Sequence, residues 1–124
     1  MKILIVEDNE PLGALLARRL EKRGHQIVVT PDAADAQSSA KAFQPDLILL
    51  EAQLRGGEDW AAARRFKFDE QTQAIPILGL VANASEAARA LALQNGCAEL
   101  SGKPVDVPRL LRLIEATAAL GAPP

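Results

Sequence analysis

Three acidic side chains and one lysine follow the most apolar runs of this sequence. They are Glu7 and Asp8 after the run at 2–6, Glu51 after the run at 46–50, and Lys103 after the run at 97–100. Carboxylates that lie together repel one another unless a cation lies among them. A hard divalent ion such as Mg²⁺ takes oxygen ligands of this kind, and the Lys103 ammonium is the other available cation. The alternative is that these acidic residues are only caps and solvated loop groups.

Five short apolar runs alternate with longer mixed stretches along the chain. The runs are Lys2–Val6, Gln26–Thr30, Asp46–Leu50, Ile75–Val81 and Cys97–Leu100. The first, third and fourth are nearly continuous in Ile, Leu and Val, which is typical of strands buried on both faces of a parallel sheet. Ligands of such sheets lie beyond the carboxyl ends of the strands. We therefore expect the three carboxylates and the lysine to converge at that edge.

The stretches between the runs carry apolar residues at helical spacing. The predicted helices are Pro11–Arg23, Asp32–Phe43, Asp59–Phe68, Glu86–Gln94 and Pro108–Ala119, with Asn9, Ser85 and Asp106 as N-caps. Trp60 is expected to point inward. This alternation predicts an α/β fold, a (βα)5 doubly wound five-stranded parallel sheet with helices on both faces. Residues 1–120 form the predicted domain, and residues 121–124 have the composition of a tail or of the start of a linker.

The composition indicates one globular domain and excludes several kinds of partner. The 124 residues are 48% hydrophobic and 24% charged. A net charge of -2 with 3% aromatic residues argues against nucleic acid as a partner. No segment reaches the roughly 18 apolar residues of a membrane span. The single cysteine, Cys97, is expected to be a small buried apolar residue of a cytoplasmic protein.

Four motifs, in order, resemble those of the response-regulator receiver family. They are ILIVEDNE at 3–10, PDLILLE at 45–51, IPILGLVANA at 75–84 and GCAELSGKP at 96–104. The resemblance runs from residue 2 to about residue 119, and it is nearest to the stand-alone, cell-cycle type of single-domain regulator. It implies a flavodoxin-like fold with strand order 2-1-3-4-5. It also implies that Glu7 and Asp8 hold Mg²⁺ together with an acceptor Asp that receives a phosphoryl group from a histidine kinase.

The sequence departs from the family pattern at three positions of the phosphorylation relay. Glu51 stands at the acceptor Asp, Val81 at the hydroxyl residue and Leu100 at the switch aromatic, with Arg55 for Pro and Asp59 for Gly as lesser departures; Glu7, Asp8, Lys103 and Pro104 match. A Glu carboxylate reaches about an ångström further than that of Asp, and such a displacement can cost ~100-fold in rate. Val81 has no hydroxyl to donate to phosphoryl oxygens, and Leu100 has no ring to swing.

These departures predict a pseudo-receiver, a phosphorylation-independent signalling module that acts by protein–protein interaction and is not an enzyme. Its degenerate phosphoacceptor site consists of Glu51, Val81, Lys103 and Leu100, and we expect Glu51 to pair with Lys103. Glu51 could then place its charge near where a phosphoryl group would lie. Weak Mg²⁺ binding at Glu7 and Asp8 is the only cofactor interaction expected.

The expected partner is a histidine kinase or another signalling protein. It would bind the face Ser85–Ala119, which resembles the docking and dimerisation face of the family, so a homodimer is one use of that face. Two other functions stay open. One is a Mg²⁺-dependent phosphoacceptor of a two-component phosphorelay, using Glu51 or a neighbouring Asp. The other is a small-molecule or nucleotide binder, although Gly56-Gly57 lacks the Lys-Ser/Thr of a phosphate-binding loop.

Overall fold

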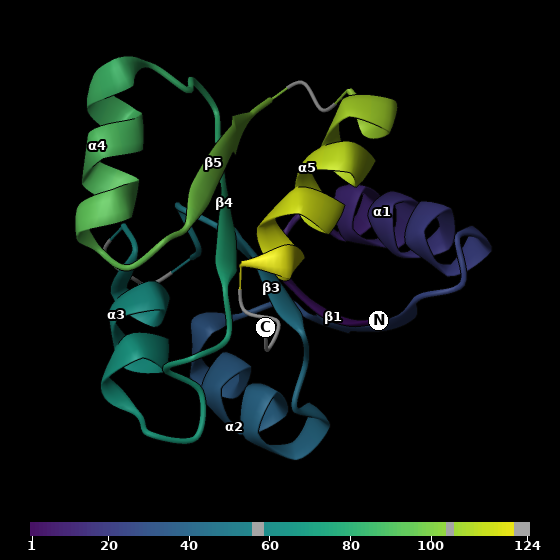
Figure 1. Ribbon diagram of the computed structural model, residues 1–124, viewed down its shortest axis with the longest axis horizontal. Helices are drawn as coiled ribbons and strands as arrows, with labels where there is room; N and C mark the ends of the chain where they lie inside the picture. The colour runs from purple at the N-terminus through teal and green to yellow at the C-terminus, as the bar shows by residue number, and fades with distance from the viewer. Residues whose placement is uncertain (56–58, 104–105, 121–124) are drawn as a thin grey trace.

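The predicted fold is confirmed in the computed structural model, which describes residues 1–55, 59–103 and 106–120 (Figure 1). The five strands are parallel and lie in the order β2-β1-β3-β4-β5. The elements are β1 Lys2–Val6, α1 Glu10–Lys22, β2 Gln26–Thr30, α2 Ala33–Phe43, β3 Leu47–Glu51, α3 Ala61–Phe68, β4 Ile77–Val81, α4 Glu86–Gln94, β5 Glu99–Gly102 and α5 Val107–Ala119. Gly56-Gly57, Pro104 and the tail 121–124 lie outside the described residues.

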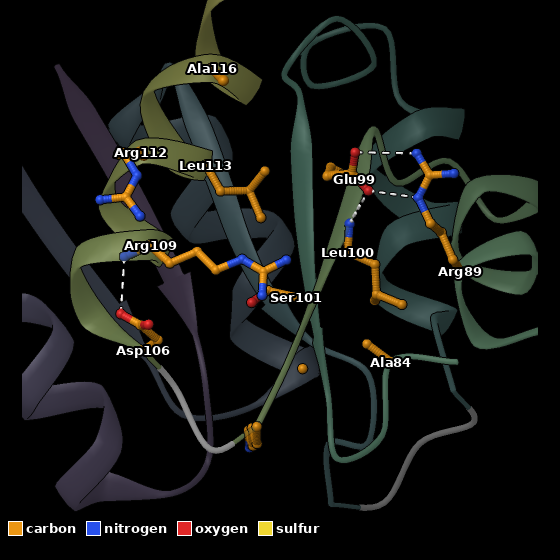
Figure 2. Close-up of a pocket in the computed structure, with 12 residues that line it drawn as sticks. Ala84, Arg89, Glu99, Leu100, Ser101, Asp106, Arg109, Arg112, Leu113 and Ala116 are labelled. Atoms are coloured by element: carbon orange, nitrogen blue, oxygen red, sulfur yellow. Dashed lines mark hydrogen bonds and ion pairs between the residues drawn. The ribbon is translucent and has the colours of Figure 1, made fainter. Parts of the chain in front are cut away.

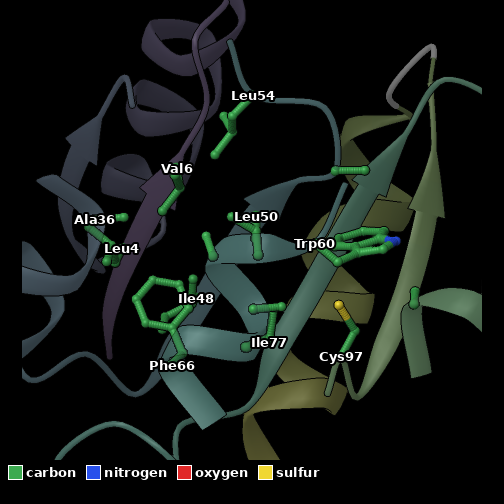
Figure 3. Packing of buried hydrophobic residues seen from close by; sticks show 14 of the residues in the cluster. Leu4, Val6, Ala36, Ile48, Leu50, Leu54, Trp60, Phe66, Ile77 and Cys97 are labelled. Carbon is green, nitrogen blue, oxygen red and sulfur yellow. The ribbon is translucent and has the colours of Figure 1, made fainter. Parts of the chain in front are cut away.

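Each face of the sheet is covered by its own set of helices. Successive residues of the central strands point to opposite faces, so Ile3 and Ile5 pack with residues of α1 and α5, such as Leu16 and Ile114. The alternate residues of the same strands, Leu4 among them, pack in a second cluster with α2, α3 and the inner side of α4 (Figure 3). The buried parallel strands therefore determine which residues lie together at the carboxyl edge of the sheet.

The predicted helix caps are formed as expected. The side chains of Asn9, Ser85 and Asp106 accept hydrogen bonds from backbone N–H groups of the first helical turn at 3.1, 3.1 and 3.2 Å. Such caps satisfy donors that have no partner inside the helix. In the described part of the chain, no helix has the length and apolar character needed to cross a membrane.

Several element boundaries differ from the expectation. β3 extends to Glu51, so the acceptor-position residue is itself paired in the sheet. The last strand begins at Glu99 rather than at Cys97, because Cys97 N donates to Ala92 O and closes the end of α4. Cys97 is nevertheless buried, as predicted.

The expectation that Asp59 begins the third helix is wrong. The helix starts at Ala61, because Trp60 has a left-handed backbone (φ 63°) that no helical residue adopts. This turn directs the indole of Trp60 into the core, where it is 3% exposed. The inward orientation predicted for Trp60 is therefore confirmed.

Candidate functional site

The carboxyl edge of the sheet brings together Glu7, Glu51 and Lys103. Glu7 follows β1 and is 1% exposed, while Glu51 is the last residue of β3 and is 6% exposed. Lys103 follows β5, and its backbone N–H donates to Val81 O at 2.9 Å. These strand-end positions make the three side chains neighbours although they are far apart in the sequence.

Lys103 forms ion pairs with both buried carboxylates. Its Nζ lies 3.0 Å from Glu7 Oε1 and also contacts Glu51 Oε2. The predicted pair between Glu51 and Lys103 is therefore confirmed. Sequence reasoning placed Glu7 at the same edge but did not identify it as a second partner of the lysine.

Both oxygens of Glu51 have partners. Oε1 accepts a hydrogen bond from the backbone N–H of Gln53 at 3.2 Å, and Oε2 contacts the Lys103 ammonium. The turn that follows β3 thus fixes one side of the carboxylate, and the residue after β5 fixes the other. The Glu51 side chain is accordingly only 7% exposed.

Burial dominates the electrostatics of Glu7. Desolvation raises the pKa of Glu7 above 4.5, the hydrogen bond from Lys103 opposes this, and the negative charge of Glu51 adds to it. Glu7 Oε2 is buried and accepts no hydrogen bond from the described residues. Burial alone would lower the pKa of Lys103, but its hydrogen bonds to Glu51 and Glu7 raise it above 10.5. Lys103 is therefore the fixed positive charge of this edge.

Asp8 lies at the same edge, where its negative charge adds to the raised pKa of Glu7, but its partner is the loop after β3 and not Lys103. Asp8 Oδ2 accepts a hydrogen bond from Arg55 N at 3.0 Å and lies 3.8 Å from Arg55 Nε. Arg55 stands where the family pattern has proline, which has no backbone N–H to donate. The loop after β3 thus binds Asp8 in a way that a family-like loop would not.

The residues as placed do not fit a Mg²⁺ ion. Within residues 1–55, 59–103 and 106–120, no three His, Cys, Asp or Glu side chains are grouped so that they could hold a metal. The ammonium of Lys103 lies against Glu7 and Glu51, and Arg55 binds Asp8. An ion that takes oxygen ligands would have to displace these cations.

Trp60 and Leu100 fill the space beside the middle of β4. A Cβ atom added to Gly79 would lie 2.8 Å from Trp60 Cζ3 and 3.2 Å from Leu100 Cδ1. Leu100 is 8% exposed, and Val81 at the end of β4 is partly buried. A glycine inside a strand often marks such a close approach, and this signal for the Trp60 contact was present in the sequence.

A hollow of about 880 Å³ lies on the predicted docking face, between α4, β5 and α5 (Figure 2). Its lining residues are Ala84, Arg89, Glu99, Leu100, Ser101, Gly102, Lys103, Asp106, Arg109, Arg112, Leu113 and Ala116. Arg89 spans one wall and donates to Glu99 through Nε at 2.9 Å and Nη2 at 3.2 Å. Sequence reasoning named this face but not the arginines that line it.

A family model and two curated relatives match nearly the whole chain. The family model described as "Response regulator receiver domain" matches residues 3–115. Protein PilH of Pseudomonas aeruginosa is 30% identical over 118 residues, which cover 95% of this chain and 98% of PilH. The polar-differentiation response regulator DivK of Brucella ovis is 31% identical over 113 residues, 91% of this chain and 92% of DivK.

A solved structure is similar over the whole fold. The receiver domain of a sensor histidine kinase from Pseudomonas aeruginosa, crystallised with a magnesium ion coordinated in its active site cleft, has a TM-score of 0.85 and 28% identity. The match covers 95% of this chain and 97% of that domain.

Proposed function

Since this chain belongs to the response regulator receiver domain family, we propose that it is a pseudo-receiver of two-component signalling. In this proposal it acts through protein–protein contacts and transfers no phosphoryl group. Residues 1–120 are the signalling domain, and the cytoplasm is its compartment, in keeping with a single buried thiol at Cys97.

The observation that carries the proposal is the arrangement around Glu51. Phosphoryl transfer depends on an acceptor oxygen that is positioned in line and on charge stabilisation by surrounding groups. Here one Glu51 oxygen contacts Lys103 and the other accepts from Gln53 N. A donor would have to break one of these contacts to reach a carboxylate that is 6% exposed.

The other relay positions support the same conclusion. Val81 offers no hydrogen-bond donor to a phosphoryl group. Leu100 and Trp60 both lie beside Gly79, so the space on that side of β4 is already filled. A charge change at Glu51 therefore meets no hydroxyl at position 81 and no aromatic ring at position 100 through which to act.

We expect no phosphoryl labelling of this chain. Incubation with acetyl phosphate and Mg²⁺, or with a phosphorylated histidine kinase, should leave the intact mass unchanged. Glu51→Asp is the matched comparison, because it shortens the acceptor and leaves Glu7, Asp8 and Lys103 in place. A stable phosphoryl adduct mapped to Glu51 of the wild-type chain would instead establish the Mg²⁺-dependent phosphoacceptor.

The partner is a histidine kinase or another signalling protein that binds the face Ser85–Ala119. The hollow between α4, β5 and α5 lies on this face and gives a partner a concave surface. Any Mg²⁺ binding at Glu7 and Asp8 is weak in this proposal, because the ion would have to displace Lys103 from Glu7 and the Arg55 contact from Asp8.

A further inference from the structure

We propose that the hollow between α4, β5 and α5 is an acid-selective docking groove, which takes an Asp- or Glu-bearing amphipathic segment of a protein partner. This inference rests on the proposed function, in which the chain acts by protein contacts. It adds the chemistry by which the partner is chosen.

The first argument is the balance of charge in the groove. Arg109 and Arg112 are exposed on α5, and neither guanidinium has a hydrogen bond or ion pair with the described residues. The other two cations are neutralised, Arg89 by Glu99 and Lys103 by the buried carboxylates. Among the described residues that line the groove, two guanidinium groups and one carboxylate, that of Asp106, therefore have no ion pair, which leaves an excess of positive charge.

The acidic residues of the groove offset these arginines only in part. Glu99 is engaged by Arg89 through two hydrogen bonds. Asp106 accepts the backbone N–H of Arg109 at 3.2 Å as the cap of α5, and its carboxylate forms no ion pair with the described residues (Figure 2). An incoming carboxylate would supply what the two guanidinium groups lack, with the bidentate geometry that Arg favours.

The second argument is the arrangement of apolar and basic residues. Arg109 and Arg112 are three positions apart on α5 and so are neighbours on one helix face. Leu113 and Ala116 line the groove from the same helix, and Leu100 lines it from β5. A complementary segment would carry an apolar side chain to contact these three residues. It would also carry carboxylates about one helical turn apart to pair with the two arginines.

A second copy of this chain is a poorer occupant. In a symmetric dimer the same patch lies on both subunits. Groove-to-groove contact would bring two patches with an excess of positive charge together, and like charges across an interface are unfavourable. The charge pattern therefore favours a different, acidic protein.

The test is a selection of displayed random peptides on the full wild-type chain, without phosphodonor. We expect the recovered peptides to contain Asp or Glu beside an apolar residue. A recovered peptide, synthesised with a fluorescent label, should bind Arg109→Glu/Arg112→Glu at least about tenfold more weakly than wild type, equal to about 1.4 kcal/mol. Its affinity for wild type should fall as salt rises.

Arg18→Glu/Arg19→Glu is the matched control. It makes the same charge change at two exposed arginines of α1, outside the groove, and should leave the affinity near that of wild type. Arg109→Gln/Arg112→Gln provides a second variant without added acidic charge. Denaturant unfolding checks that every variant folds.

Several outcomes would overturn the proposal. They are recovered peptides without acidic residues, an equal loss in the α1 control, displacement of the peptide by inorganic phosphate or a nucleotide, and a wild-type dimer that the α5 variants disperse. Failure to recover any peptide would also count against a docking groove. A phosphoryl adduct at Glu51 would refute the proposed function alone, because the charge dependence of peptide binding is measured separately.

Discussion

At the scale of single residues, Lys103 decides the character of the acidic edge. It supplies one positive charge to two buried carboxylates, Glu7 and Glu51. Breaking a buried pair by removing one partner is costly, because the remaining charge stays buried without compensation. Removal of the lysine leaves two such charges, whereas removal of one carboxylate leaves the lysine with the other.

We therefore expect Lys103→Met to destabilise the protein more than Glu51→Gln. The cost for a fully buried pair is ~3–5 kcal/mol. The Lys103 side chain is 28% exposed, so about 1–2 kcal/mol is expected for Lys103→Met and less for Glu51→Gln. Denaturant unfolding of wild type, both single variants and the double variant should show a double-variant loss smaller than the sum. Strict additivity would mean that the two side chains do not interact.

Glu7 predicts a pH dependence that Glu7→Gln should remove. The folded-state pKa of Glu7 is raised by burial, so the folded chain binds this proton more tightly than the unfolded chain. The contribution of Glu7 to stability is then fully present below about pH 4.5 and is lost as the pH rises through the folded-state pKa. The free energy of unfolding of wild type minus that of Glu7→Gln should fall from about pH 4 toward neutrality. A constant or rising difference would refute the raised pKa.

At the scale of elements, β4 and the start of α3 are fitted to each other. Gly79 leaves room in β4 for the indole of Trp60, whose left-handed backbone begins α3. A bulky residue in that conformation costs on the order of 1–3 kcal/mol and persists only when surrounding packing holds it. Burial of the indole among the residues of the second core cluster provides that packing.

Gly79→Ala should destabilise the protein by roughly 1–3 kcal/mol, the usual range for overpacking a well-packed core. The added Cβ would meet Trp60 and Leu100 at distances that require them to shift. Trp60→Phe removes the outer ring atoms nearest to that Cβ, so the double variant should lose less than the sum of the single losses. Thermal and denaturant unfolding measure both. An unchanged stability of Gly79→Ala would show that β4 and Trp60 are not in close contact.

At the scale of the whole molecule, Lys103 belongs both to the acidic edge and to the proposed docking groove. Its side chain pairs with the acidic edge, and the residue also lines the groove between α4, β5 and α5. The carboxyl edge of the sheet and the docking face are thus adjacent through β5. The ammonium that pairs with Glu7 and Glu51 thus belongs to a residue that also lines the groove.

Wild type should gain little stability from Mg²⁺, and Lys103→Met should gain more. A ligand that binds only the folded state stabilises it by RT ln(1 + [L]/Kd), about 0.4 kcal/mol when its concentration equals Kd. Lys103→Met frees Glu7 and Glu51 for the ion, while Lys103→Arg retains the charge and serves as the control. The midpoint of thermal unfolding at increasing Mg²⁺ measures this. A large wild-type shift at submillimolar Mg²⁺ would show that the acidic site is intact.

The sequence by itself determined the class of fold and which charged residues lie at the carboxyl edge of the sheet. Continuous Ile, Leu and Val runs that alternate with amphipathic stretches predict a buried parallel sheet with helices on both faces, and the resemblance to the receiver family implied the strand order 2-1-3-4-5. Strand ends then place Glu7, Glu51 and Lys103 together. The pairing of Glu51 with Lys103 followed from this placement, because a lysine was the available cation beside an acidic side chain.

Only the tertiary structure decided how the charges are shared. The division of Lys103 between Glu7 and Glu51, and the capture of Asp8 by Arg55, depend on side-chain directions set by packing and by the loop after β3. The start of α3 at Ala61 follows from the left-handed backbone of Trp60, whose indole packs beside Gly79, a residue distant in the sequence. Glu99 pairs with Arg89 and not with Arg109 or Arg112, and this choice of partner also depends on the packing of α4 against β5. The spacing of charged residues in the sequence brings them to one edge of the sheet. Which of them pair is determined by the distances between their side chains, and these are set when elements distant in the sequence pack together.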